Sequence, residues 1–248
     1  MHSLLDHPLI SSRYFFPRPD APIHPFSVDV EGATLACARY EMHPGAPWLV
    51  HFHGNGEVVA DWEHEYLPHF RAAGLNVFFA EYRGYGASTG TPGMITMLGD
   101  VPPVLAAVGT KPENMVVYGR SVGSIFAVES AYRTPNLGGL VIESGIASPI
   151  ERILMRVRPE EIGAELAEMM HEAEKHLDHQ KKLGAFPGRT LVLHAKHDSM
   201  VQRSHAERNA AWAKKSALVL YEQGDHNDVT GVNLDDIVSR VVRFVRGG

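Results

Sequence analysis

Residues 115–133 read Met-Val-Val-Tyr-Gly-Arg-Ser-Val-Gly-Ser-Ile-Phe-Ala-Val-Glu-Ser-Ala-Tyr-Arg, and this stretch decides the fold. An apolar run over Met115–Tyr118 precedes the pattern Gly119-Arg120-Ser121-Val122-Gly123, and a helical pattern over Ser124–Tyr132 follows it. The pattern Gly-x-Ser-x-Gly is weak by itself. Between a buried strand and a helix, however, it indicates a sharp turn that exposes the serine hydroxyl. We therefore predict that Ser121 is a nucleophile; the alternative is a glycine-rich turn with an incidental serine.

The rest of the chain repeats the same order of strand and then helix. Buried parallel strands are expected at Trp48–Phe52, Asn76–Ala80, Met115–Tyr118, Leu140–Ile142, Thr190–His194 and Ala217–Tyr221, because these apolar runs are continuous rather than alternating. Helices are expected at Trp62–Ala73, Met94–Val108, Ser124–Tyr132, Ser204–Ala213 and Leu234–Val245. A hairpin of Phe26–Val30 and Ala33–Tyr40 begins the sheet antiparallel. The prediction is an α/β protein, with a mostly parallel eight-stranded twisted sheet and helices on both faces.

One segment, residues 148–188, interrupts this alternation. It holds no clear strand, and its apolar residues lie near helical spacing. Long insertions at the strand ends of such sheets often cover a site, so we predict a small helical cap inside a single domain that spans residues 1–248. The alternative is that these helices simply pack on the core.

Composition narrows the class of protein. The 248 residues are 44% hydrophobic and 21% charged, with a net charge of −6, a balance typical of a globular protein without a preference for nucleic acid. The single cysteine, Cys37, excludes an intrachain disulfide. Because no apolar stretch could span a bilayer and no signal peptide is apparent, we expect a soluble cytoplasmic protein.

A serine nucleophile needs a histidine base, and the histidine needs a carboxylate that fixes its tautomer. In folds with this type of turn, the acid and then the histidine follow the serine along the chain. Asp198 lies just beyond the strand Thr190–His194, and His226 follows the last strand in Gly224-Asp225-His226. These two residues are our predicted acid and base. Asp225 and Asp228 remain alternative acids, and His194 and His197 remain alternative bases.

Backbone N–H groups must stabilise the negative charge that develops on the substrate oxygen. One is expected from Val122, directly after the nucleophile. The other is expected from the glycine-rich loop His53-Gly54-Asn55-Gly56-Glu57, which follows the strand Trp48–Phe52. Asn55 is the predicted donor, with Gly56 as the second choice.

Together, these motifs and Tyr82-Arg83-Gly84-Tyr85-Gly86-Ala87-Ser88-Thr89-Gly90 resemble the α/β-hydrolase superfamily, and more narrowly its Bem46-like and ABHD13/ABHD17-type serine hydrolases. The resemblance extends from about residue 26 to the C-terminus. It implies a carboxylesterase or thioesterase that acts on a small-molecule substrate without a cofactor. Two departures from the group are Glu57 in the glycine-rich loop and a segment 148–188 that is rich in Glu, His and Met.

The same sequence is also compatible with other functions. A peptidase or amidase of the prolyl-peptidase type would use the same triad, and Glu143, Glu160 and Glu161 are weak candidates to bind a substrate amino group. A non-catalytic ligand-binding protein of the same fold is the second alternative. Metal binding is a further alternative, because His176 and His179 would share a helical face and such spacing can ligate zinc. The cluster His171, Glu172, Glu174, His176 and His179 lacks the His-Glu-x-x-His pattern, however, and solvated helices often carry such residues, so no metal is predicted. Met155, Met169 and Met170 would suit a flexible acyl pocket, although methionines more often belong to a core.

Overall fold

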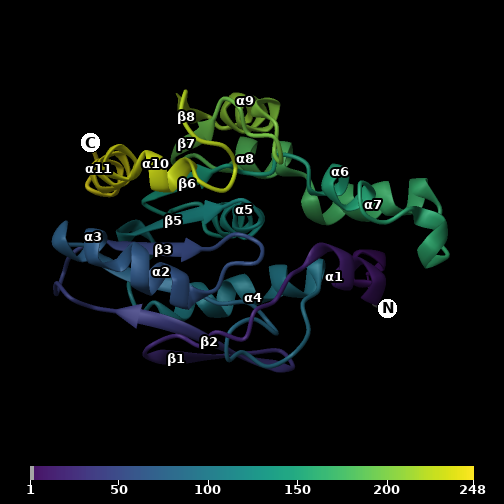
Figure 1. Ribbon diagram of the computed structural model, residues 1–248, viewed down its shortest axis with the longest axis horizontal. Helices are drawn as coiled ribbons and strands as arrows, with labels where there is room; N and C mark the ends of the chain where they lie inside the picture. The colour runs from purple at the N-terminus through teal and green to yellow at the C-terminus, as the bar shows by residue number, and fades with distance from the viewer. Residues whose placement is uncertain (1–2) are drawn as a thin grey trace.

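The computed structural model describes residues 3–248, and the core of the molecule is one eight-stranded sheet in the order β1-β2-β4-β3-β5-β6-β7-β8 (Figure 1). The strands are β1 Pro25–Val30, β2 Ala33–Tyr40, β3 Trp48–Phe52, β4 Asn76–Ala80, β5 Met115–Arg120, β6 Gly139–Glu143, β7 Arg189–Ala195 and β8 Lys215–Tyr221. β1 and β2 pair antiparallel, as do β2 and β4, and every pair from β4 to β8 is parallel. The predicted fold class is therefore confirmed.

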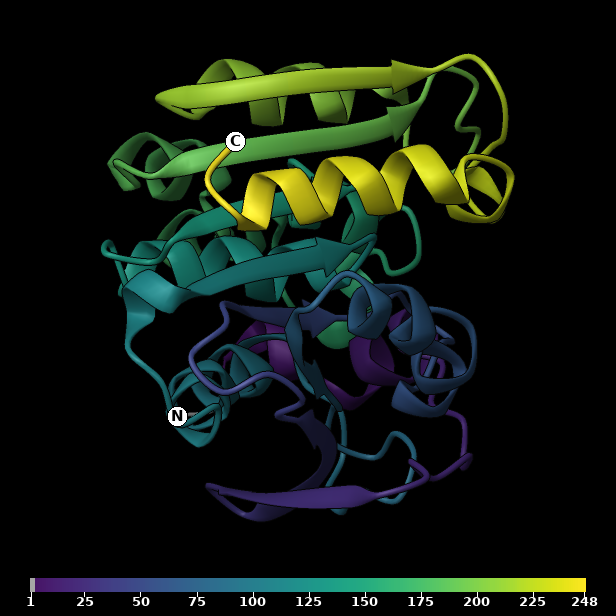
Figure 2. The ribbon, with the colours of Figure 1, turned by 90° about the vertical axis from the view of Figure 1, so that its left-hand side faces the viewer.

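Helices cover both faces of this sheet. The helices are α1 Pro8–Tyr14, α2 Val59–Glu65, α3 Leu67–Ala72, α4 Met94–Ala107, α5 Gly123–Arg133, α6 Pro149–Leu154, α7 Leu166–Leu177, α8 His179–Ala185, α9 Arg203–Trp212, α10 Val229–Val232 and α11 Leu234–Val245, with short 3-10 turns η1 Leu4–Asp6, η2 Pro112–Asn114 and η3 Pro159–Ile162. Helices α2, α3 and α11 lie on one face, where α11 crosses in front of the strands in Figure 2. Helices α4, α5, α8 and α9 cover the other face.

The continuous apolar runs of the central strands follow from this two-sided cover. All residues of β3, β4, β5 and β6 are buried. Successive side chains enter different cores: Val117 packs on the α5 side, while Val116 and Tyr118 pack on the α11 side. The sheet is thus a rigid support whose parallel strands all end at one edge.

The predicted helix Trp62–Ala73 is wrong, because the chain forms two short helices there. Helix α2 ends at Glu65, and α3 begins at Leu67 with Pro68 in its first turn. A proline has no N–H to donate and its ring collides with the carbonyl one turn earlier, so a single helix cannot continue through Pro68.

The N-terminal residues fold against the domain, which the sequence did not indicate. The Asp6 carboxylate accepts hydrogen bonds from the backbone N–H groups of Ile95 (2.7 Å) and Thr96 (3.0 Å), in the first turn of α4. The chain then forms α1 and passes over the edge of the sheet where the parallel strands end. This path places Tyr14 and Phe16 at the site described below.

The segment 148–188 consists of α6, η3, α7 and α8. Helix α8 packs on α5 and α9 and so belongs to the layer that covers the sheet. Helices α6 and α7 contact each other, α7 contacts η1, and both extend beyond the sheet beside α1 (Figure 1). None of the helices within residues 3–248 combines the length and the hydropathy of a bilayer-crossing segment.

Candidate active site

Ser121 lies at the end of β5, on a turn that strains the backbone. Its φ of 50° lies in the left-handed region, which non-glycine residues rarely adopt. Flanking glycines make the turn possible: a Cβ atom on Gly123 would overlap the carbonyl oxygen of Phe52. The Ser121 N–H donates to the Glu143 carbonyl at 2.9 Å, which ties the turn to β6. This is the strand, sharp turn and helix that the sequence predicted.

The three predicted triad side chains meet above this turn. His226 Nε2 lies 2.8 Å from Ser121 Oγ, and His226 Nδ1 lies 2.8 Å from Asp198 Oδ2. All three residues are buried. These partners assign the ring nitrogens of His226: Nδ1 carries the proton donated to the Asp198 carboxylate, and the unprotonated Nε2 accepts a hydrogen bond from the Ser121 hydroxyl.

Asp198 is held by its own loop. One carboxylate oxygen, Oδ1, accepts hydrogen bonds from the backbone N–H groups of Met200 (2.9 Å) and Val201 (2.6 Å), while Oδ2 faces His226. Burial pushes the pKa of Asp198 upward, but the hydrogen bond and charge of His226, with the Val201 N–H, outweigh it and hold the pKa below its usual value. The carboxylate is therefore ionised at neutral pH.

The alternative triad members occupy other positions. Asp225 and Asp228 are exposed and close the turn before His226, where Asp228 Oδ1 accepts from the Asp225 N–H at 2.6 Å. His194 is buried, with Nε2 2.8 Å from the Val201 carbonyl, and His197 is exposed. Among residues 3–248, the side-chain hydrogen-bond partner of Ser121 Oγ is His226 rather than any of these four residues.

The loop 53–57 faces Ser121 across a pocket that both line. Within the described residues 3–248, the backbone N–H groups of Asn55 and Val122 donate no hydrogen bond to a protein acceptor. The Asn55 side chain, by contrast, forms hydrogen bonds through both its oxygen and its nitrogen. Its Oδ1 accepts from the Phe16 N–H (2.9 Å) and the Tyr85 hydroxyl (2.8 Å), and its Nδ2 donates to the Tyr14 carbonyl. The two predicted oxyanion donors are thus available at the pocket wall.

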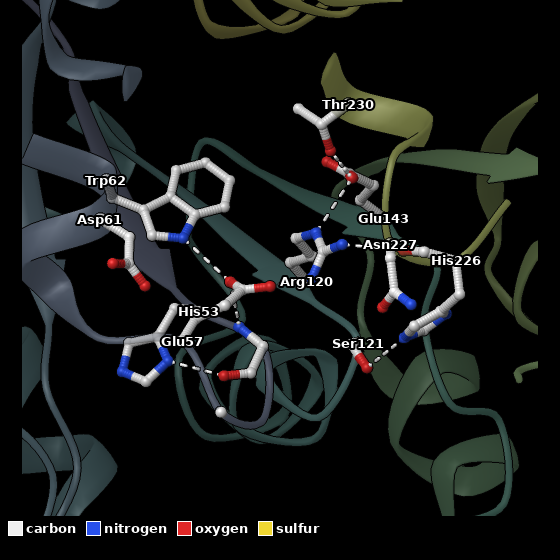
Figure 3. Close-up of polar contacts among 12 residues, drawn as sticks. His53, Glu57, Asp61, Trp62, Arg120, Ser121, Glu143, His226, Asn227 and Thr230 are labelled. Carbon is white, nitrogen blue, oxygen red and sulfur yellow. Dashed lines mark hydrogen bonds and ion pairs between the residues drawn. The ribbon is translucent and has the colours of Figure 1, made fainter. Parts of the chain in front are cut away.

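A buried polar network links the segments that carry Ser121, Glu57 and His226 (Figure 3). Arg120 forms an ion pair with Glu57 and donates through Nη2 to the His226 carbonyl at 2.8 Å. Glu57 in turn accepts from the Gly54 N–H (2.8 Å) and the Trp62 indole N–H (2.9 Å). Burial alone would raise the pKa of Glu57, but the Arg120 charge outweighs it and holds the pKa below its usual value. The pair is therefore a true ion pair at neutral pH.

Glu143, the last residue of β6, completes this network. Its carboxyl group is fully buried, accepts from the hydroxyl groups of Tyr118 and Thr230, and lies 3.4 Å from Arg120 Nε. Burial raises the pKa of Glu143 to about 8, so the side chain is mostly neutral at pH 7. In the sequence, Glu57 is recognisable only as a departure from the related group. No sequence pattern predicts that Arg120 and Glu143 belong to the same polar network as Glu57.

The pocket above Ser121 has a volume of about 290 Å³. Tyr14 and Phe16 line it from the N-terminal segment, and Arg152 and Arg156 line it from α6 and the turn that follows. Neither pair was predicted, because their placement depends on how two segments fold back over the strand ends. Met200, beside Asp198, also lines the pocket.

Two minor possibilities that the sequence left open do not apply to this pocket. Met155 and Met170 are exposed and Met169 belongs to the core, so none of the three lines the pocket. The weak candidates for binding a substrate amino group do not line the pocket either: Glu143 is buried beneath the turn, and Glu160 and Glu161 are exposed.

The histidine side chains of residues 171–179 have different surroundings in the structure. His179 is buried with Nδ1 2.9 Å from the Ile146 carbonyl, while His171 and His176 line a groove between α7 and α4. In residues 3–248, no three or more His, Cys, Asp or Glu side chains are arranged to hold a metal ion.

Comparisons with known proteins agree with this architecture. No family model matches the chain. The human protein "Alpha/beta hydrolase domain-containing protein 17B" is 25% identical over 205 residues, which cover 80% of this chain and 67% of the relative. The uncharacterized protein YfhR of Escherichia coli K12 is 27% identical over 207 residues, or 79% of this chain and 69% of the relative. This chain therefore spans about two thirds of the length of both relatives.

Solved structures show the same fold. An esterase of Pyrococcus furiosus superposes with a TM-score of 0.70 at 16% identity, covering 93% of this chain and 98% of its own. The esterase RhEst1 of a Rhodococcus species gives a TM-score of 0.68 at 21% identity, covering 89% and 98%. The fold and the site define the chain as a protein of the α/β-hydrolase fold. Within that fold it resembles the ABHD17-type proteins and YfhR, which confirms the resemblance expected from its motifs.

Proposed function

We propose that this protein is a serine hydrolase that cleaves a carboxylic ester or thioester of a small-molecule substrate through an acyl-enzyme intermediate. The observation that carries the proposal is the 2.8 Å contact between Ser121 Oγ and His226 Nε2, on a strained turn that faces a pocket. The α/β-hydrolase fold and its esterase neighbours support a hydrolase activity.

The proposed reaction has two halves. His226 takes the Ser121 proton as the oxygen attacks the acyl carbon, and the N–H groups of Asn55 and Val122 stabilise the oxyanion. The leaving alcohol or thiol receives the proton from His226, and the acyl group stays on Ser121. Water then loses a proton to His226 and attacks the acyl-enzyme, which releases the acid and restores the serine.

Amide cleavage by a prolyl-type peptidase would use the same groups. We rank it second because the acidic side chains considered for holding a substrate amino group do not line the pocket, which presents Arg152 and Arg156 instead. A non-catalytic binding protein remains the outcome to be tested directly, because it would retain the fold without the reaction.

A fluorophosphonate probe tests the proposal, because it labels only an activated serine. We expect labelling of the native protein and hydrolysis of 4-nitrophenyl butyrate. Both should be lost in Ser121→Ala, with a fall in kcat on the order of 10⁴-fold or more. Ser199→Ala, an exposed serine beside Asp198, is the matched control and should retain both. A folded native protein that neither labels nor cleaves any ester would favour the binding protein.

A further inference from the structure

Two arginines in the Ser121 pocket have no carboxylate partner. Arg152 lies in α6 and Arg156 in the turn that follows, and both half-buried side chains line the same pocket as Ser121 and His226. Within residues 3–248, neither guanidinium forms an ion pair, since the nearby carboxylates are paired elsewhere. Glu57 pairs with Arg120, Glu151 with Arg208, and Glu161 with Arg13. Two positive charges at the pocket wall are therefore uncompensated.

Each guanidinium is held in a way that leaves donors free. Arg156 donates through Nη1 to the Arg13 carbonyl at 3.1 Å, and its guanidinium carbon lies 5.1 Å from the centre of the Phe16 ring. These contacts fix its position at the pocket wall. Arg152 donates through Nη1 to the Met155 sulfur at 3.2 Å, and a thioether is a weak acceptor. Because a guanidinium has five N–H donors, both side chains retain hydrogen-bonding capacity toward a ligand.

Tyr14 adds a neutral donor to the same wall. Burial raises the pKa of its phenol to about 12, although the nearby charges of Arg152 and Arg156 act in the opposite direction. The hydroxyl therefore keeps its proton at neutral pH. Glu57 is the one carboxylate on the pocket wall, and its charge is matched by Arg120. The free part of the pocket thus favours an anion.

We propose that Arg152 and Arg156 bind an anionic oxygen group of the substrate, a carboxylate or a phosphate, while Ser121 attacks its ester bond. The inference deepens the proposed function and rests on it. Guanidinium groups bind both anions through paired, charge-assisted hydrogen bonds. The pocket has a volume of only about 290 Å³, so an anion bound by the arginines and the carbonyl attacked by Ser121 must lie close together. The favoured substrate is therefore a short ester with a negative charge near the ester bond.

Matched substrate pairs test this proposal. Mono-4-nitrophenyl glutarate differs from 4-nitrophenyl pentanoate by a terminal carboxylate in place of a methyl group. 1-Butyrylglycerol 3-phosphate differs from 1-butyrylglycerol by a phosphate. We expect kcat/KM to favour the charged member of at least one pair by about tenfold or more at low salt, with the preference falling as salt is added. The pair that shows the preference identifies the anion as carboxylate or phosphate. Ser121→Ala supplies the background rate for each ester.

The variant Arg152→Met should reduce the charged-to-neutral ratio of kcat/KM severalfold, mainly through KM, and Arg152→Met with Arg156→Met should abolish it. Arg158→Met is the matched control, because Arg158 belongs to the same segment but is 79% exposed and lies outside the pocket; its ratio should equal that of the native protein. If the double variant does not fold, competitive inhibition of native neutral-ester hydrolysis by glutarate or inorganic phosphate supplies the test.

The possible failures are distinguishable. Equal kcat/KM for the members of both pairs, in a protein that still cleaves neutral esters, would overturn the anion site and leave the proposed function intact. An unchanged charged-to-neutral ratio of kcat/KM in the double variant Arg152→Met with Arg156→Met would likewise overturn the anion site and leave the proposed function intact. Absence of ester cleavage together with absence of fluorophosphonate labelling would overturn the proposed function itself.

Discussion

The Arg120 guanidinium donates a hydrogen bond to the backbone carbonyl of His226, at 2.8 Å from Nη2. The same guanidinium pairs with Glu57, in the loop that carries Asn55. Arg120 also directly precedes Ser121 in the chain. One buried side chain therefore connects the turn of the proposed nucleophile, the loop of the proposed base and the loop of the predicted oxyanion donor.

This arrangement predicts that Arg120 affects the reaction mainly by positioning the three loops, although its side chain also lies at the pocket wall. A lysine keeps the charge but cannot reach Glu57 and His226 with a planar set of donors. We expect Arg120→Lys to lower kcat for 4-nitrophenyl butyrate by about 10²-fold, because small displacements of reacting groups cost that much, with a lesser change in KM. Arg189→Lys is the control: Arg189 donates to the Phe244 carbonyl at 2.8 Å, away from the site, and its loss should spare kcat. A change confined to KM would contradict the positioning role.

Asp198 should act as the orienting acid. In Asp198→Asn the residue keeps its size but loses the negative charge that fixes the His226 proton on Nδ1 and stabilises the imidazolium. We expect kcat to fall by about 10³–10⁴-fold with KM little changed. Asp225→Asn, in the turn before His226, is the control and should remain within a few-fold of the native rate. A larger loss in Asp225→Asn than in Asp198→Asn would reassign the acid.

The raised pKa of Glu143 predicts a specific dependence of stability on pH. The folded protein holds the Glu143 proton up to about pH 8, whereas an exposed glutamate releases it near 4.5. Between these values the folded state binds more protons than the unfolded state, so the free energy of unfolding falls as pH rises, by at most about 1.4 kcal/mol per pH unit from this group.

The variant Glu143→Gln removes this titration. Urea unfolding between pH 5 and pH 8 should show a shallower loss of stability in Glu143→Gln than in the native protein. Glu160→Gln, an exposed glutamate of η3, should follow the native slope. Identical slopes for the native protein and Glu143→Gln would mean that Glu143 is ionised in the folded state.

The parts of the site that were predictable are those set by local structure and by sheet topology. The Ser121 turn could be predicted because strand, turn and helix are adjacent in sequence. Asp198 and His226 could be predicted because parallel strands end at one edge of the sheet, so the loops after β7 and β8 converge there. The position of the loop 53–57 beside Ser121 followed from the same rule.

The remaining parts depend on contacts between segments that are distant in sequence. Arg152 and Arg156 reach the pocket only because α6 extends over the strand ends beside the N-terminal segment. No periodic pattern marks such a contact, and α6 has only six residues. The Arg120 network was missed for the same reason: Glu57 and Arg120 are 63 residues apart.

Asn55 provides a final prediction, because its side chain and its backbone have separate roles. The backbone N–H is the predicted oxyanion donor, while the side chain binds the Tyr14 carbonyl, the Phe16 N–H and the Tyr85 hydroxyl. Asn55→Ala keeps the N–H but frees both the loop and the N-terminal segment. We expect unfolding to become easier by about 2–3 kcal/mol, since each lost hydrogen bond contributes roughly 1 kcal/mol, together with faster proteolysis between Phe16 and Pro22.

The rate of ester hydrolysis should also fall in Asn55→Ala, by about tenfold, because a mobile loop holds the donor less well at the oxyanion. Tyr85→Phe removes only one of the three bonds and should give a smaller change in both stability and rate. If Asn55→Ala lost stability but kept the native kcat, the loop would hold its N–H in place without help from the N-terminal segment. The segment would then serve the pocket wall, through Tyr14 and Phe16, rather than the oxyanion.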